Sequence, residues 1–178
     1  MEKVINGKLN PELGLKIRCS LDLRGTAITE LPEGLKVGGD LDLEGTAITE
    51  LPEGLKIGGY LDLEGAAITA LPEDLEVGRY LDLKDTAITE LPEDLEVGRY
   101  LYLGGTDITN YPVVYNCGDD SRAIYLDLKD KELIRIGCFI GTKDEAISRI
   151  SEKYSGTAKE DYINKVIECF NMYKGMIK

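Results

Sequence analysis

The chain has 178 residues, a formal net charge of −12 and no histidine. The absence of histidine excludes Ser-His-Asp and Cys-His catalysis and any zinc site that needs an imidazole ligand. Residues 1–120 hold 24 Asp/Glu and 10 Lys/Arg, whereas residues 121–178 hold 9 and 11. Because the acidic part repels nucleic-acid phosphates, we expect no nucleic acid among the partners.

Targeting signals and metal motifs are lacking in the sequence. No apolar stretch approaches the ~20 residues of a membrane-spanning helix, and the N-terminus has no signal-peptide pattern. We therefore expect a cytoplasmic protein with no membrane partner. The four cysteines (Cys19, Cys117, Cys138 and Cys169) form no CxxC pair, which predicts reduced thiols, no metal site and no cofactor.

A twenty-residue unit repeats almost unchanged from Leu21 to Tyr100, and a fifth copy begins at Leu101 and loses the pattern after Pro112. Residues 41–60 read LDLEGTAITELPEGLKIGGY. A fixed period of this length is typical of a solenoid, in which each unit buries its apolar side against its neighbours. We predict an N-terminal cap at residues 1–20, a solenoid of five coils at residues 21–120 and a C-terminal cap at residues 121–178.

Each unit begins with an alternation of apolar and charged residues, Leu41-Asp42-Leu43-Glu44 in the second copy. This alternation predicts a short strand with both leucines facing inward. Pro52 and the Gly58-Gly59 pair favour extended backbone on the return path. We therefore predict a parallel β-sheet on the concave face and extended segments on the convex face.

The pattern LxLxxTxIxxLPxxL resembles a leucine-rich repeat, with Thr46 where that family usually has asparagine. A twenty-residue unit with LP in its second half resembles the short bacterial class found in secreted effectors of enteric pathogens. The motif VGGxLDLxGTxI is similar to the repeats in proteins of phages and gut bacteria. The resemblance implies a leucine-rich-repeat solenoid that serves as a general binding scaffold.

The C-terminal part begins with a copy of the strand motif, since residues 125–130 repeat residues 80–85 as YLDLKD. This copy predicts a sixth strand of the same sheet, and residues 132–139 predict a returning strand that completes a β-hairpin. Two capping boxes, which begin at Thr142 and Thr157, predict two α-helices. The Gly-Cys-Phe-x-Gly-Thr lead-in at residues 137–142 resembles the C-terminal module of the phage proteins. We expect the hairpin and helices to cap the last coil, and a recruitment module is the alternative.

Outward-facing residues of successive strands stack about 4.8 Å apart and form columns. The candidate partner-binding residues are the aspartates of one column, the tyrosines of another and the tyrosine that interrupts the aspartates. They are Asp22, Asp42, Asp62 and Asp82, then Tyr60, Tyr80, Tyr100 and Tyr125, and Tyr102. Stacked carboxylates repel each other, so the aspartate column is either a by-product of repeat duplication or a functional patch for Lys/Arg-rich partners. Calcium bridging between the carboxylates is a further open alternative.

The leading functional prediction is a monomeric, non-enzymatic protein-binding scaffold whose acidic, tyrosine-bearing face accepts a basic protein. Two alternatives stay open. The first is a phage-encoded inhibitor of a host or defence protein that acts by charge mimicry. The second is a hydrolase that uses a pair of carboxylates, as glycoside hydrolases do.

Overall fold

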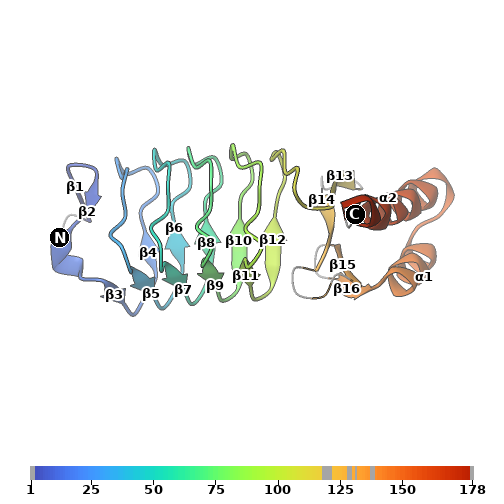
Figure 1. Cartoon of the computed structure of the whole chain (residues 1–178), viewed down its shortest axis with the longest axis horizontal. Coiled ribbons are helices and arrows are strands. Elements are labelled where there is room, and N and C mark those ends of the chain that lie inside the picture. The colour runs from blue at the N-terminus through green and yellow to red at the C-terminus, as the bar shows by residue number, and fades with distance from the viewer. Residues whose placement is uncertain (1–2, 118–121, 128–129, 131, 137–138, 177–178) are drawn as a thin grey trace. The chain divides into compact units, whose positions relative to one another are not determined.

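The computed structural model describes residues 3–117, 122–127, 130, 132–136 and 139–176. It divides into two compact units, Met1–Ile108 and Thr109–Lys178 (Figure 1). The first unit contains the repeats, so the boundary lies earlier than the one expected at residue 120. Residues 118–121, on which part of the predicted insertion falls, lie outside the described residues.

The first unit opens with a small hairpin of β1 (Val4–Ile5) and β2 (Lys8–Leu9), followed by a 3₁₀ helix, η1 (Pro11–Leu13). The Thr29 N–H donates to the Gly7 carbonyl at 2.8 Å, and Lys8 forms an ion pair with Glu30 at 2.7 Å. The hairpin is thereby attached to the turn of the first repeat.

The repeats build two five-stranded parallel sheets, confirming the predicted solenoid. The first, called here the aspartate–tyrosine sheet, contains β4 (Leu21–Asp22), β6 (Leu41–Asp42), β8 (Leu61–Asp62), β10 (Tyr80–Asp82) and β12 (Tyr100–Tyr102). The second, called the lysine–glutamate sheet, contains β3 (Lys16–Ile17), β5 (Lys36–Val37), β7 (Lys56–Ile57), β9 (Glu76–Val77) and β11 (Glu96–Val97). The sequence analysis expected extended segments on the return path but not this second sheet.

The apolar positions of each repeat fill the space between the two sheets. Leu41, Leu43, Ile48 and Leu55 of one coil are fully buried, as are their counterparts at Leu61, Leu63, Ile68 and Leu75. Each fully buried side chain of this size contributes about 1.5–3 kcal/mol through removal from water. Because every repeat supplies the same set, the coils stack with the register that the period predicts.

Two further residues of each repeat shape the turns. The buried Thr46 hydroxyl donates to the Leu43 carbonyl at 2.7 Å, where it holds the turn after the strand. Gly58 has a different role from the conformational freedom expected of it. A Cβ added there would lie 2.4 Å from the Gly38 carbonyl oxygen, so the close approach of neighbouring coils requires glycine.

The second unit contains a four-stranded antiparallel sheet in the order β13 (Val113–Cys117), β14 (Arg122–Leu126), β15 (Leu133–Ile136) and β16 (Phe139–Thr142). Two helices follow, α1 (Lys143–Lys153) and α2 (Gly156–Met176). Thr142 and Glu145 form the predicted capping box of α1, whereas α2 begins before Thr157. Neither of these helices has the length and apolarity that a membrane span requires.

The sixth strand that the sequence predicts for the solenoid sheet does not form there. Tyr125 lies on β14, where it pairs with Val113 and Arg135 in the antiparallel sheet and not with the parallel strands of the solenoid. Tyr125 and Leu126 of the copied motif therefore adopt a different pairing, because β13 and β15 supply antiparallel neighbours that the other repeats lack.

Candidate functional site

Three predicted tyrosines form a row along the aspartate–tyrosine sheet. The ring centroids of Tyr60 and Tyr80 are 5.6 Å apart, and those of Tyr80 and Tyr100 are 5.2 Å apart and stacked. Tyr102 extends the row, with its centroid 6.4 Å from that of Tyr100, and is 38% exposed. The sheet register causes this arrangement, because Tyr80 and Tyr100 are direct partners on β10 and β12. We call these four residues the tyrosine row.

Tyr125, the fifth tyrosine predicted for this surface, does not belong to it. It is part of the second unit and is only 3% exposed. The sequence placed it in the tyrosine column only because its local motif matched that of Tyr80.

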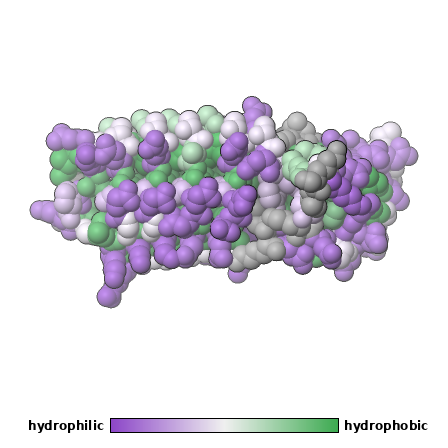
Figure 2. Space-filling model, viewed as in Figure 1, coloured by the Kyte–Doolittle hydropathy of each residue, from purple (hydrophilic) through white to green (hydrophobic). Residues whose placement is uncertain are grey.

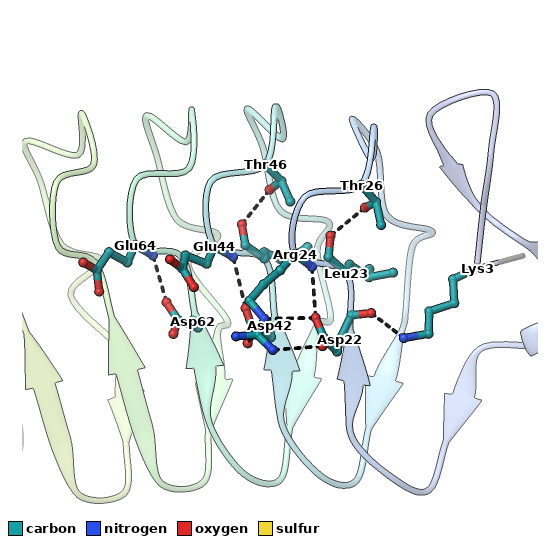
Figure 3. A network of polar contacts seen from close by, with 11 residues as sticks. Lys3, Asp22, Leu23, Arg24, Thr26, Asp42, Glu44, Thr46, Asp62 and Glu64 are labelled. Atoms are coloured by element: carbon teal, nitrogen blue, oxygen red, sulfur yellow. Dashed lines mark hydrogen bonds and ion pairs between the residues drawn. The ribbon is translucent and has the colours of Figure 1, made fainter.

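The predicted aspartate column is formed, since Asp22, Asp42, Asp62 and Asp82 are successive register partners. Its first two members share one cation. Arg24 donates from Nη2 to Asp22 at 3.0 Å and its Nε lies 3.0 Å from Asp42 (Figure 3). The hydrogen bonds from Arg24 lower the pKa of Asp22 to about 2. Asp22 is thus paired within the chain, but the two carboxylates together have only this one cation.

Asp82, at the other end of the column, is buried with 2% exposure. Its carboxylate accepts the Tyr60 hydroxyl at 3.3 Å and the Lys84 backbone N–H at 3.0 Å, and the Lys84 ammonium lies 3.2 Å away. Asp82 is therefore not an accessible contact, which corrects its assignment to the partner-binding surface. Instead, the Asp82 carboxylate lies beneath the surface and holds the Tyr60 hydroxyl and the Lys84 ammonium in place.

Asp62 is half-buried between the two ends, and its carboxylate accepts the Glu64 backbone N–H at 3.0 Å. Burial raises the pKa of Asp62, and the charges of Asp82 and Asp42 add to the effect. The same environment raises the pKa of Tyr60, where burial is the largest cause and Asp82 and Asp62 follow. The Tyr60 hydroxyl consequently remains protonated at neutral pH and serves as a hydrogen-bond donor.

The carboxylate oxygens of Asp62, Glu64 and Asp82 lie within 4.8 Å of one another, close enough to bind a cation together. The Lys84 ammonium already lies 3.2 Å from both Glu64 and Asp82. These contacts raise the pKa of Lys84 even though its partial burial acts in the opposite direction. The chain's own lysine thus supplies the positive charge at the position where calcium would bind.

The ion pairs of Arg24 and Lys84 were not anticipated from the sequence. For Lys84 the signal was present in the period, because residues twenty apart are strand neighbours and Lys84 therefore lies beside Glu64. The tyrosine row also contacts cations of its own chain. The Lys84 ammonium lies 5.5 Å from the Tyr102 ring centroid, and the Arg79 guanidinium lies 5.4 Å from that of Tyr80.

A cavity in the described part of the first unit lies away from this sheet surface. It has a volume of about 750 Å³ and is lined by the N-terminal hairpin and first turn, including Ile5, Leu9, Leu15 and Leu31. None of the predicted site residues lines it. Figure 2 shows rows of hydrophilic side chains that run across successive coils of the first unit.

We found no match to this chain among protein-family models, curated proteins or solved structures.

Proposed function

We propose that the chain is a non-enzymatic scaffold that binds a basic protein through its aspartate–tyrosine sheet. The observation that carries the proposal is the continuous tyrosine row beside accessible carboxylates on one face. Asp42 and Asp62 are partly exposed on this sheet, and Glu44 and Glu64 follow them at the strand ends (Figure 3).

The contacts of Lys84 and Arg79 indicate how a basic partner would bind. Each places its cation about 5.5 Å from a tyrosine centroid, which is the geometry of a cation–π interaction. Lysine and arginine side chains of a partner would use the exposed ring faces of the tyrosine row in the same way, while their charges meet Asp62 and Glu64. Tyrosine suits such a surface because it offers a large contact area with few rotatable bonds.

The exposed carboxylates and the tyrosine rings are expected to have different roles in binding. Exposed carboxylates accelerate association and make it sensitive to salt, whereas well-packed aromatic anchors slow dissociation. Asp22 is expected to contribute little directly because Arg24 pairs with it, and Asp82 because it is buried.

The test is a titration of a labelled arginine-rich peptide of about ten residues, followed by fluorescence anisotropy. The double variant Asp62→Asn/Glu64→Gln should bind at least about fivefold more weakly than the wild type because two of the facing charges are removed. The control variant Glu50→Gln/Glu90→Gln removes the same charge from exposed turn residues and should bind like the wild type.

Two results would contradict the proposed function. Equal weakening in both double variants would show that only overall charge matters and that the sheet is not the site. Tight binding of a DNA oligonucleotide of similar length would show that the partner is not selected by its positive charge.

A further inference from the structure

The lysine–glutamate sheet carries a second column of charged residues, on which the proposed function does not depend. Its outward residues are register partners from strand to strand: Lys16, Lys36, Lys56, Glu76 and Glu96. The residue that follows each of the last four faces the core, as Val37 and Ile57 do, and Ile17 after Lys16 is partly buried. The column therefore has three positive charges followed by two negative charges.

Neighbouring residues reinforce this division. Arg18 adds positive charge next to β3, whereas Asp74 and Asp94 precede β9 and β11 at positions where the earlier repeats have glycine. The sign changes between Lys56 and Glu76, which form an ion pair within the chain. Two arginines, Arg79 and Arg99, follow β9 and β11 in the acidic half and are exceptions to this division. The Arg79 guanidinium lies over the Tyr80 ring of the other sheet.

Exposed glycines lie beside the charged column. Gly38, Gly58, Gly78 and Gly98 occupy the next outward positions and carry no side chains. Their presence is required by the close packing of the coils, as the contact between Gly58 and the Gly38 carbonyl shows. One consequence is that no side chain projects from these four positions.

We propose that the lysine–glutamate sheet binds the same sheet of a second copy of this chain, with the coils of the two copies in opposite order. A twofold axis at the sign boundary places Lys56 opposite the second copy's Glu76 and Lys36 opposite its Glu96. Such an interface is self-complementary, because each contact occurs twice. A uniformly basic or acidic partner would meet like charges over half of the column, and a second copy meets none in this register.

The size of the column sets the strength of this association. Five strands about 4.8 Å apart give a column about 20 Å long. Such a column would have to be about 40 Å wide to reach the roughly 800 Å² per partner typical of stable interfaces, whereas its strands have two residues each. Exposed ion pairs are also weakened by salt. The dimer is thus weak and salt-sensitive and replaces the monomer expected from the sequence at high protein concentration.

Sedimentation equilibrium of the full chain at about 0.1–1 mM protein tests the proposal, in about 20 mM and about 300 mM NaCl, where screening differs strongly. The wild type should dimerise in low salt and lose at least about tenfold in association constant in high salt. Lys36→Glu and Glu96→Lys should each abolish dimerisation, because each brings like charges together across the axis.

An equimolar mixture of the two variants gives the most specific result. In the mixed dimer the reversed charge at position 36 of one copy faces the reversed charge at position 96 of the other, so this contact again joins opposite signs. The second contact keeps its native charges, and association should return. The controls Lys174→Glu and Glu50→Lys should dimerise like the wild type. The variant Asp62→Asn/Glu64→Gln should also dimerise normally, which separates this interface from the proposed partner-binding face.

Three outcomes would overturn the proposal: a wild type that stays monomeric in low salt, single variants that still dimerise, or a mixture that does not. Thermal melts establish that the variants are folded. If a charge reversal lowers the melting temperature, Lys36→Gln and Glu96→Gln take its place, and each should weaken the dimer severalfold without introducing repulsion.

Discussion

Asp62 and Asp82 are register partners on adjacent strands, but among the described residues only Asp82 of the two has a lysine ammonium against its carboxylate. Asp82 is buried with Tyr60 and Lys84 as hydrogen-bonding partners. Asp62 is half-buried, which raises its pKa above the ordinary value, and the charges of the neighbouring Asp82 and Asp42 add to the effect. The same position of the repeat therefore has a structural role at Asp82 and carries an accessible, unfavourably placed charge at Asp62, one coil earlier.

Asp62→Asn should increase stability at neutral pH. The raised pKa means that the folded state binds the proton of Asp62 more tightly than the unfolded state does, so stability is lost as the pH rises through that pKa. Asparagine removes this loss and can still accept the Glu64 N–H. Solvent screening limits the gain to about 0.5 kcal/mol.

Urea unfolding at pH 7 and at decreasing pH values checks this prediction. The advantage of Asp62→Asn should shrink as the pH falls toward the unfolded-state pKa of about 3.9. Asp107→Asn, at an exposed residue after β12, changes the net charge equally and should show no such gain. An advantage that grows at low pH would contradict the account of Asp62.

Lys84→Met should destabilise the first unit, because it leaves the buried Asp82 without its ammonium partner. The Tyr60 hydroxyl and the backbone N–H of residue 84 remain, which limits the expected cost to about 1–3 kcal/mol. Lys36→Met removes an exposed lysine and should cost much less. Equal losses of unfolding free energy in the two variants would show that Lys84 does not compensate Asp82.

Gly58→Ala should destabilise the solenoid by about 2–3 kcal/mol, since the added methyl group overlaps backbone atoms that cannot move independently. Gly104→Ala is the matched control, because a Cβ there meets only the Lys84 side chain, at 3.6 Å. Its effect on the melting temperature should be close to zero. A mild Gly58→Ala variant would mean that the coils are not so closely packed at the glycine positions.

Leu63→Asp should abolish the cooperative thermal unfolding of the solenoid, because Leu63 is fully buried and a charge there has no partner. The cost is several kcal/mol, a large part of the stability of a domain of this size. Ala47→Asp introduces the same charge at an exposed turn residue and should leave the transition cooperative. A cooperative melt in Leu63→Asp would contradict the assigned core layer.

The twenty-residue period predicted the parallel sheet and the alignment of its columns, because an unchanged repeat places equivalent residues in register. It did not predict the lysine–glutamate sheet, whose strands have two residues each and lack an extended alternating pattern. The burial of Asp82 also escaped prediction, since it depends on Tyr60 from one coil and Lys84 from another. Tyr125 was misplaced because its motif copies the repeat, whereas pairing with β13 and β15 decides its sheet.

The most direct test of the central claim is an NMR titration with tyrosine rings labelled with carbon-13 and an unlabelled arginine-rich peptide. The account predicts that the ring resonances of Tyr80, Tyr100 and Tyr102 shift as the peptide is added and that all three give the same dissociation constant. The rings of Tyr154 and Tyr162, which stack on each other in the helical unit, should not shift. Shifts confined to Tyr154 and Tyr162 would contradict the assignment of the aspartate–tyrosine sheet as the binding face.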